Sequence, residues 1–230
     1  PEPAEQVAEV QREPARSTVP AAAPKPARVS KSQPTVARRE PTAQAEVRMV
    51  APGEELGDCP VDILFFHAHP DDESLAFGVM MAAASRAGKS LAAVLFTDGE
   101  AGKDLYPRRA VGGMYPDRRL QGRELAEVRV REACAALAIL GCRVYVRLGL
   151  ENRPYNGLHD EVGPEEVIAA WGGEEELVAE LERIMRAFRP RIVISPASDS
   201  GAREHFEHKA VGILVAEAVA SLRGEGFIYG

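Results

Sequence analysis

Histidine and carboxylate side chains occur together at two places in the sequence. The first place is residues 67–73 (HAHPDDE), in which His69 and Asp72 are three positions apart. Imidazole nitrogens and carboxylate oxygens are both good zinc ligands, and Pro70 constrains the turn between them. Asp71 lies beside them and is available as a base toward a metal-bound water. Acidic residues also cap helix N-termini, so capping alone explains this segment equally well.

The second place is residues 205–208 (HFEH), where His205 and His208 are three positions apart. Two side chains at this spacing face the same way on a helix. Four of the five histidines of the chain belong to the two clusters. If the clusters meet in the fold, they can supply three protein ligands and leave one position open, which is the arrangement of a catalytic zinc site. The alternative is a pair of exposed histidines at the start of a helix.

The segments that must position these side chains alternate between strands and helices. Continuous apolar strands between helices predict an α/β, Rossmann-like three-layer fold with a mostly parallel sheet. Ligand sites in such sheets form at the carboxyl ends of the strands, where both clusters are expected. The sequence predicts strands over residues 61–66, 91–97, 143–148 and 191–195, the start of another over 227–229, helices over 74–87, 121–140, 174–188 and 207–222, and loops over 99–120 and 149–173.

Four short motifs follow one another along the chain: residues 68–73 (AHPDDE), 97–100 (TDGE), 129–132 (RVRE, with Leu-Gly at 140–141) and 205–211 (HFEHKAV). Over about residues 61–230 this series resembles the LmbE-like, or PIG-L, N-acetylglucosaminyl deacetylases. The family usually has Pro-Asp where this chain has Phe206 and Glu207. That aspartate is held to orient the first histidine of its motif, so we expect a looser geometry around His205.

The resemblance implies a role for each residue of the two clusters. His69, Asp72 and His208 would bind zinc, and the same nitrogen and oxygen ligands accept Fe²⁺ or another divalent ion. Asp71 would be the general base that takes a proton from the zinc-bound water. His205 would stabilise the oxyanion or protonate the leaving amine, because an amine leaves poorly without a proton.

For each of two further residues, the sequence allows two roles. Arg129 contacts the substrate or, equally, pairs with Glu132. Asp98 binds a sugar hydroxyl, or it serves only as the turn-forming residue before Gly99.

The function implied by the resemblance is zinc-dependent removal of an N-acetyl group from an N-acetylglucosamine-type amino sugar or its conjugate. One alternative is an amidase of the same fold that acts on a non-sugar amide. The other is a non-catalytic module that binds metal or sugar.

The composition indicates which binding partners and which cellular compartment to expect. The net charge of −7 argues against nucleic acid or an anionic membrane as the main partner. The sequence contains no run of about 18 apolar residues, so it predicts no membrane helix. The three cysteines fit no zinc finger or disulfide framework, which favours a reducing compartment. We therefore expect a cytoplasmic protein with a small-molecule amino-sugar or amide substrate; an anchored or exported form is the alternative, since the chain begins with Pro1.

The first part of the chain differs in composition from the rest. Residues 1–50 contain eight prolines and ten alanines but no glycine or aromatic residue. Such a segment buries too little apolar surface to offset its ordering entropy. The sequence therefore predicts a disordered Pro/Ala-rich linker over residues 1–57 and a deacetylase domain over residues 58–230, which we expect to be truncated at its C-terminus.

Overall fold

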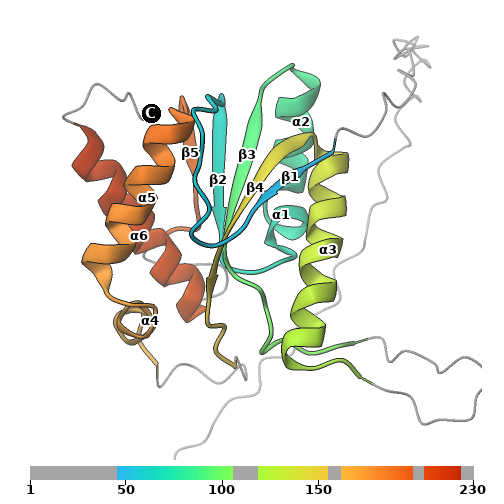
Figure 1. Ribbon diagram of the computed structural model, residues 1–230, viewed down its shortest axis with the longest axis vertical. Helices are drawn as coiled ribbons and strands as arrows, with labels where there is room; N and C mark the ends of the chain where they lie inside the picture. The colour runs from blue at the N-terminus through green and yellow to red at the C-terminus, as the bar shows by residue number, and fades with distance from the viewer. Residues whose placement is uncertain (1–45, 106–118, 155–161, 199–204, 224–230) are drawn as a thin grey trace, which may run out of the picture. The chain divides into compact units, whose positions relative to one another are not determined.

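The architecture is known from a computed structural model, which describes residues 46–105, 119–154, 162–198 and 205–223. Its centre is a five-stranded sheet in which every pairing is parallel, in the order β1-β4-β3-β2-β5 (Figure 1). The strands are β1 (Arg48–Val50), β2 (Ile63–His67), β3 (Leu91–Thr97), β4 (Cys142–Leu150) and β5 (Ile192–Ile194).

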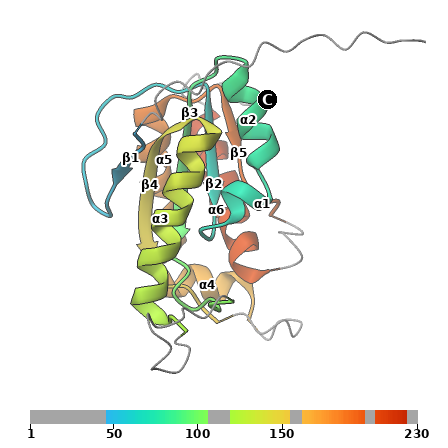
Figure 2. The same cartoon turned by 90° about the vertical axis from the view of Figure 1, so that its right-hand side faces the viewer.

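Helices cover both faces of this sheet, as the two views in Figures 1 and 2 show. One face carries α1 (Asp72–Leu75), α2 (Gly78–Arg86) and α3 (Gly122–Leu140), and the other carries α4 (Pro164–Ala170), α5 (Glu174–Phe188) and α6 (Phe206–Leu222). The predicted three-layer α/β fold with a parallel sheet is therefore confirmed.

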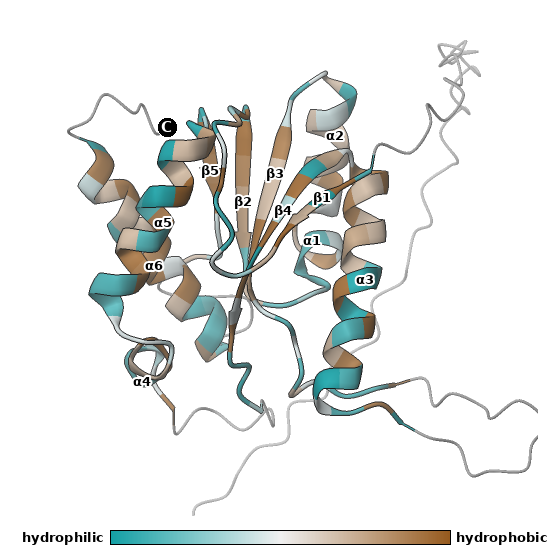
Figure 3. Cartoon of the chain, in the orientation of Figure 1, coloured by the Kyte–Doolittle hydropathy of each residue, from teal (hydrophilic) through white to brown (hydrophobic). Residues whose placement is uncertain are grey.

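The apolar core is divided by the sheet into two layers. Leu64 and Phe66 of β2 belong to the layer under α4, α5 and α6, whereas Ile63 and Phe65 belong to the layer under α1, α2 and α3. Successive strand residues point to opposite faces, so a strand buried on both faces must be apolar at every position. Strands β2 and β3 are accordingly hydrophobic along most of their length in Figure 3, while α5 also carries hydrophilic segments.

Three elements differ from the sequence-based predictions. The helix predicted over 74–87 is divided into α1 and α2, because Phe77 turns into the core and packs on Phe65 with 5.6 Å between ring centroids. Helix α4 lies in a segment predicted as loop; its first residue is Pro164, a favoured first helical residue, and Val167 is buried. Strand β1 lies inside the predicted linker.

Strand β1 changes the domain boundary. Arg48–Val50 pair in register with Val144, Tyr145 and Val146 of β4, and Val50 is 1% exposed. The ordered domain therefore begins before residue 58, and the prediction of a disordered linker up to residue 57 is wrong for this strand. The earlier linker residues and the strand predicted over 227–229 lie outside the described residues. Within the described segments, no helix is both long and apolar enough to cross a membrane.

Candidate metal centre

The turn after β2 holds the first cluster in a fixed shape. The Oδ2 atom of Asp72 accepts hydrogen bonds from the backbone N–H groups of Ala68 (3.1 Å) and His69 (3.0 Å). Asp71 has a φ of 140°, rare for a non-glycine residue, and its N–H donates to Oε2 of Glu73 at 2.9 Å. Backbone strain of this kind often marks functional sites. The turn thus directs the Asp72 carboxylate back across the turn and places Asp71 at the cavity.

Three side chains converge from the two clusters, which are more than 130 residues apart in the chain. The Nδ1 atom of His69 lies 3.1 Å from Nε2 of His208. The Oδ2 atom of Asp72 lies 3.2 Å from Nε2 of His208 and 3.9 Å from Nδ1 of His69. A tetrahedral zinc with ligand distances of about 2.05 Å separates its ligand atoms by about 3.3 Å. The two spacings that involve Nε2 of His208 match this value, whereas the 3.9 Å spacing between Asp72 and His69 is wider. Both histidines are buried, and the three atoms are close enough to share one ion.

The position of the ring proton on His69 favours a role as metal ligand. Its Nε2 atom contacts Oε2 of Glu207, a fully buried residue. The same carboxylate accepts from Nδ2 of Asn152 (2.8 Å) and from the backbone N–H of Arg153 (2.7 Å). A carboxylate only accepts, so the proton of a neutral His69 lies on Nε2 and the Nδ1 lone pair faces the other two ligand atoms. Metal-binding histidines are commonly held in this way.

Glu207 therefore has a different partner from the one expected. The sequence suggested that residue 207 orients His205, but its carboxylate contacts His69. His205 is instead the N-cap of α6, and its Nδ1 atom accepts from the backbone N–H of Glu207 at 3.3 Å. The longer glutamate side chain reaches the metal-ligand group, and the His205 ring is fixed by the backbone.

His205 stands against both histidine ligands, with ring centroids 4.8 Å from His69 and 4.9 Å from His208. Burial, followed by the charges of these two histidines, lowers the pKa of His205 to about 4. Because its Nδ1 atom accepts a hydrogen bond, the proton of the neutral ring lies on Nε2. His205 is thus a neutral donor, which suits stabilisation of an oxyanion.

Asp71 is held by Arg129. The guanidinium donates to Oδ2 of Asp71 (3.0 Å), to the carbonyl of Pro70 (2.6 Å) and to the carbonyl of Gly99 (3.0 Å). Burial raises the pKa of the Asp71 carboxyl, and the charge of Arg129 opposes this. Arg129 thus pairs with Asp71, whereas Glu132, the partner considered from the sequence, is exposed.

The structure explains why residue 99, in the second motif, is a glycine. Its φ is +75°, and a Cβ atom at this position would lie 2.2 Å from Nη1 of Arg129. Only glycine leaves room for the guanidinium and also adopts this backbone conformation easily. Thr97 of the same motif donates to the carbonyl of Ala68 at 2.9 Å and joins β3 to the first cluster.

A cavity of about 840 Å³ opens over these side chains at the carboxyl ends of the strands. It is lined by all five residues of the predicted metal and catalytic sets and by Arg129. Asp98 is not among its lining residues; Arg147 binds the Asp98 carboxylate, with Nε at 3.0 Å from Oδ1. The sugar contact predicted for Asp98 therefore has no support in the geometry and stays a prediction.

The sequence-based interpretation missed three polar residues that line this cavity: Lys103, Asn152 and Arg153. Asn152 and Arg153 directly follow β4, so the rule that sites form at carboxyl ends of parallel strands was the available signal. Lys103 lies in the segment after β3 and carries no motif of its own.

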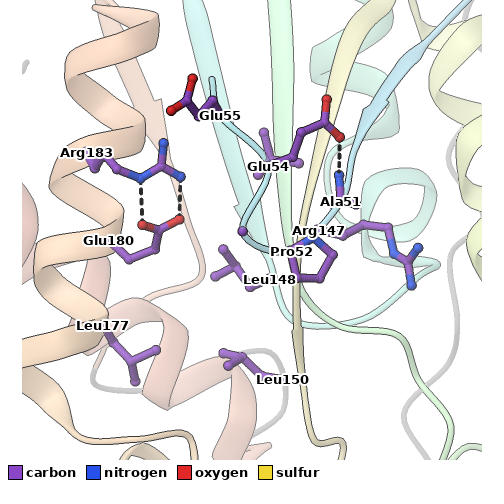
Figure 4. A pocket seen from close by; sticks show the side chains of 12 residues that line it. Ala51, Pro52, Glu54, Glu55, Arg147, Leu148, Leu150, Leu177, Glu180 and Arg183 are labelled. Atoms are coloured by element: carbon purple, nitrogen blue, oxygen red, sulfur yellow. Dashed lines mark hydrogen bonds and ion pairs between the residues drawn. The ribbon is translucent and has the colours of Figure 1, made fainter. Parts of the chain in front are cut away.

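A second cavity, of about 490 Å³, lies between residues 51–55, the end of β4 and α5 (Figure 4). Leu148, Leu150 and Leu177 form its apolar part, and Glu180 is bound by Arg183 across one wall. Each group of described side chains that could hold a metal ion includes His69. The second cavity is therefore no candidate metal site.

Comparison with known proteins identifies the family of the chain. Residues 64–219 match the family model described as PIG-L, GlcNAc-PI de-N-acetylase. The chain belongs to the PIG-L family. It is 34% identical over 168 residues to 1D-myo-inositol 2-acetamido-2-deoxy-alpha-D-glucopyranoside deacetylase 2 of Catenulispora acidiphila, covering 71% of this chain and 53% of the relative. A deacetylase of the same substrate name from Kineococcus radiotolerans is 31% identical over 182 residues, covering 74% and 47%. This PIG-L chain thus spans about half the length of these relatives.

Solved structures show the fold of the PIG-L chain but not its chemistry. N,N'-diacetylchitobiose deacetylase from Pyrococcus horikoshii superimposes with a TM-score of 0.53 at 24% identity, covering 73% of this chain and 52% of that one. GalB, a 4-carboxy-2-hydroxymuconate hydratase from Pseudomonas putida, gives 0.52 at 21% identity, covering 73% and 59%. A deacetylase and a hydratase share this fold, so the reaction must be argued from the site.

Proposed function

We propose that the protein is a zinc-dependent N-deacetylase that hydrolyses the acetamido group of an N-acetylglucosamine-type amino sugar or its conjugate. The observation that carries the proposal is the convergence of His69, Asp72 and His208, whose ligand atoms lie 3.1–3.9 Å apart and can share one metal ion. The names of the curated relatives, deacetylases of a 2-acetamido-2-deoxy-glucopyranoside, support the substrate class.

The three ligands suit a divalent ion in an open site. Burial acts to raise the pKa of Asp72, but the hydrogen bond with His208 and the charges of the nearby histidines outweigh it and lower the pKa below its usual range, so the carboxylate is ionised. Zinc bound by these groups would lower the pKa of a water molecule to about 7 and polarise the acetyl carbonyl. Three protein ligands leave one position for water or substrate.

Asp71 is the base in this proposal. Its carboxylate lines the cavity next to the ligand Asp72, and Arg129 fixes one of its oxygens. Asp71 takes a proton from the attacking water as the new C–O bond forms. It can then give this proton to the departing nitrogen when the C–N bond breaks, which yields acetate and the free amine.

His205 completes the proposed machinery. Its ring is fixed by the hydrogen bond at Nδ1, which leaves the ring proton on Nε2, and the residue lines the cavity. A preorganised donor at this position stabilises the negative charge that develops on the carbonyl oxygen.

Acetate release and metal content test the proposal together. The wild type, Asp71→Ala and the control Arg183→Ala are loaded with zinc and incubated with N-acetylglucosamine, its conjugates and non-sugar acetamides. We expect about one zinc per chain in all three proteins and acetate release from the sugars only by the wild type and the control. Release from non-sugar amides alone would favour the amidase alternative. Zinc binding without any turnover would favour a binding module.

A further inference from the structure

Arg153 differs from the other described arginines in its surroundings. Most of the other described arginines form an ion pair with a carboxylate. Those that form no ion pair with a described residue are exposed. Arg153 is partly buried and yet has no ion-pair partner among the described residues. Its side chain lines the cavity of the metal centre, and its backbone N–H is already used by Glu207. A partly desolvated guanidinium without a counter-charge is costly unless a ligand supplies one.

A second cation, the exposed Lys103, belongs to the same cavity. Lys103 lines the cavity, and among the described side chains it too has no ion-pair partner. Arg129 has a different environment, because its guanidinium is occupied by Asp71 and two backbone carbonyls. Lys103 and Arg153 are therefore the two cations of this cavity that remain available to a ligand.

Hydrogen bonds fix the two segments that carry these cations to each other. The backbone N–H of Ala101 donates to Oδ1 of Asn152 (3.0 Å), and the N–H of Asn152 donates to Oε1 of Glu100 (2.6 Å). The indole N–H of Trp171 holds the carbonyl of Glu151 at 2.9 Å. Because both segments are anchored, less conformational entropy is lost when the cations bind an anion.

We propose that Lys103 and Arg153 form a subsite for an anionic group of the substrate, so that the preferred substrate is an amino sugar bearing a phosphate or carboxylate. The planar guanidinium of Arg153 binds such oxyanions through two parallel hydrogen bonds, and the ammonium of Lys103 adds a point charge. The chain as a whole has a charge of −7, so a local excess of cations in this cavity selects for an anionic ligand. This inference rests on the deacetylase function proposed above and narrows its substrate.

The test compares N-acetylglucosamine with its 1-phosphate and 6-phosphate. The wild type, Arg153→Gln, Lys103→Gln and the control Arg183→Ala are assayed for kcat/KM with each compound. We expect the wild type to prefer one of the phosphates by about 10- to 100-fold, as expected for hydrogen bonds to charged groups, and each subsite variant to lose most of this preference. Arg153→Lys should restore part of it, and the control should keep the wild-type ratio.

Equal losses with neutral and phosphorylated sugars would mean that Arg153 only supports Glu207, and this would overturn the subsite. The absence of any phosphate preference in the wild type would overturn it as well. If no compound is hydrolysed, the deacetylase proposal fails separately, and calorimetric dissociation constants for the same sugars decide the subsite. Tighter binding of a sugar phosphate that is lost in Arg153→Gln supports it, and equal binding of neutral and phosphorylated sugar rejects it.

Discussion

Charged side chains line the cavity of the metal centre and the cavity beside α5, but they meet different partners. In the cavity beside α5, Glu180 is bound by Arg183, and Glu54 accepts from the backbone N–H of Ala51 (Figure 4). In the cavity above the sheet, two imidazole nitrogens approach to 3.1 Å with a carboxylate oxygen beside them.

The difference indicates where a ligand is needed. Paired charges on a protein surface require nothing further and contribute little to stability. Converging lone pairs repel one another unless a proton or a cation lies between them, so the second arrangement is stable when a metal ion fills it. The number of charged residues around a cavity is thus a weaker indicator of function than the partners those residues have.

The largest effect is expected from removal of a ligand. His208→Ala leaves two protein ligands, so we expect zinc affinity to fall by about 1,000-fold or more and deacetylation to reach background. Zinc titration against a competing chelator measures the affinity. Zinc affinity close to that of wild type in this variant would contradict the assignment.

The second largest effect is expected from Asp71→Asn. Loss of the base should reduce kcat by about 100- to 10,000-fold, the range for general acid–base catalysis, while zinc content is unchanged. Steady-state kinetics and metal analysis on the same sample check both parts. A variant that loses its zinc together with its activity would place Asp71 among the ligands.

A smaller effect is expected from Glu207→Gln, which keeps the side-chain volume but removes the charge next to Nε2 of His69. Partners of metal-binding histidines typically change metal affinity by about 10- to 100-fold. We expect a loss in this range, measured by zinc titration, with a circular dichroism spectrum like that of wild type. Unchanged affinity would show that the backbone alone orients His69.

Gly99→Ala tests the support of Asp71 through Arg129. The new Cβ atom would fall 2.2 Å from Nη1 of Arg129, so the guanidinium must move and kcat/KM should fall about tenfold. Gly122→Ala is the matched control, because Gly122 also has a positive φ (+54°) but a Cβ atom there meets nothing within 4 Å. Similar kcat/KM values for the two variants would remove the role given to Arg129.

The smallest effect is expected in the second cavity. Arg183→Ala breaks a surface ion pair with Glu180, so the free energy of unfolding should change by less than about 1 kcal/mol and activity should not change. Urea denaturation and the acetate assay measure the two quantities. A large loss of activity here would mean that the second cavity also serves the reaction.

The sequence predicted some elements because their patterns are local. Strand β3 and helix α5 have the predicted bounds, since each is a continuous periodic segment with a turn or proline after it. The break between α1 and α2 was not predictable, because it depends on Phe77 packing against a strand. Strand β1 has three residues in a Pro/Ala-rich segment and exists through its pairing with β4.

The same distinction holds at the candidate site. The histidine spacings and the rule for strand ends predicted that the two clusters meet, and the family resemblance implied His69, Asp72 and His208 as the ligands. The structure brings these three side chains together. The partner of Glu207 was not predictable, because it lies 138 residues away in the chain and depends on how far a glutamate side chain reaches. The pairing of Arg129 with Asp71 was not predictable for a similar reason, because the contact crosses from α3 to the turn after β2.

The most direct test of the central claim is zinc X-ray absorption spectroscopy on the zinc-loaded protein and on His208→Ala. We predict about one zinc per chain, with two imidazole nitrogens at about 2.0–2.1 Å and carboxylate or water oxygens at about 2.0–2.2 Å, and the loss of an imidazole in the variant. A spectrum with sulfur at about 2.3 Å, or one that is unchanged in His208→Ala, would show that the metal binds elsewhere and would contradict the assignment.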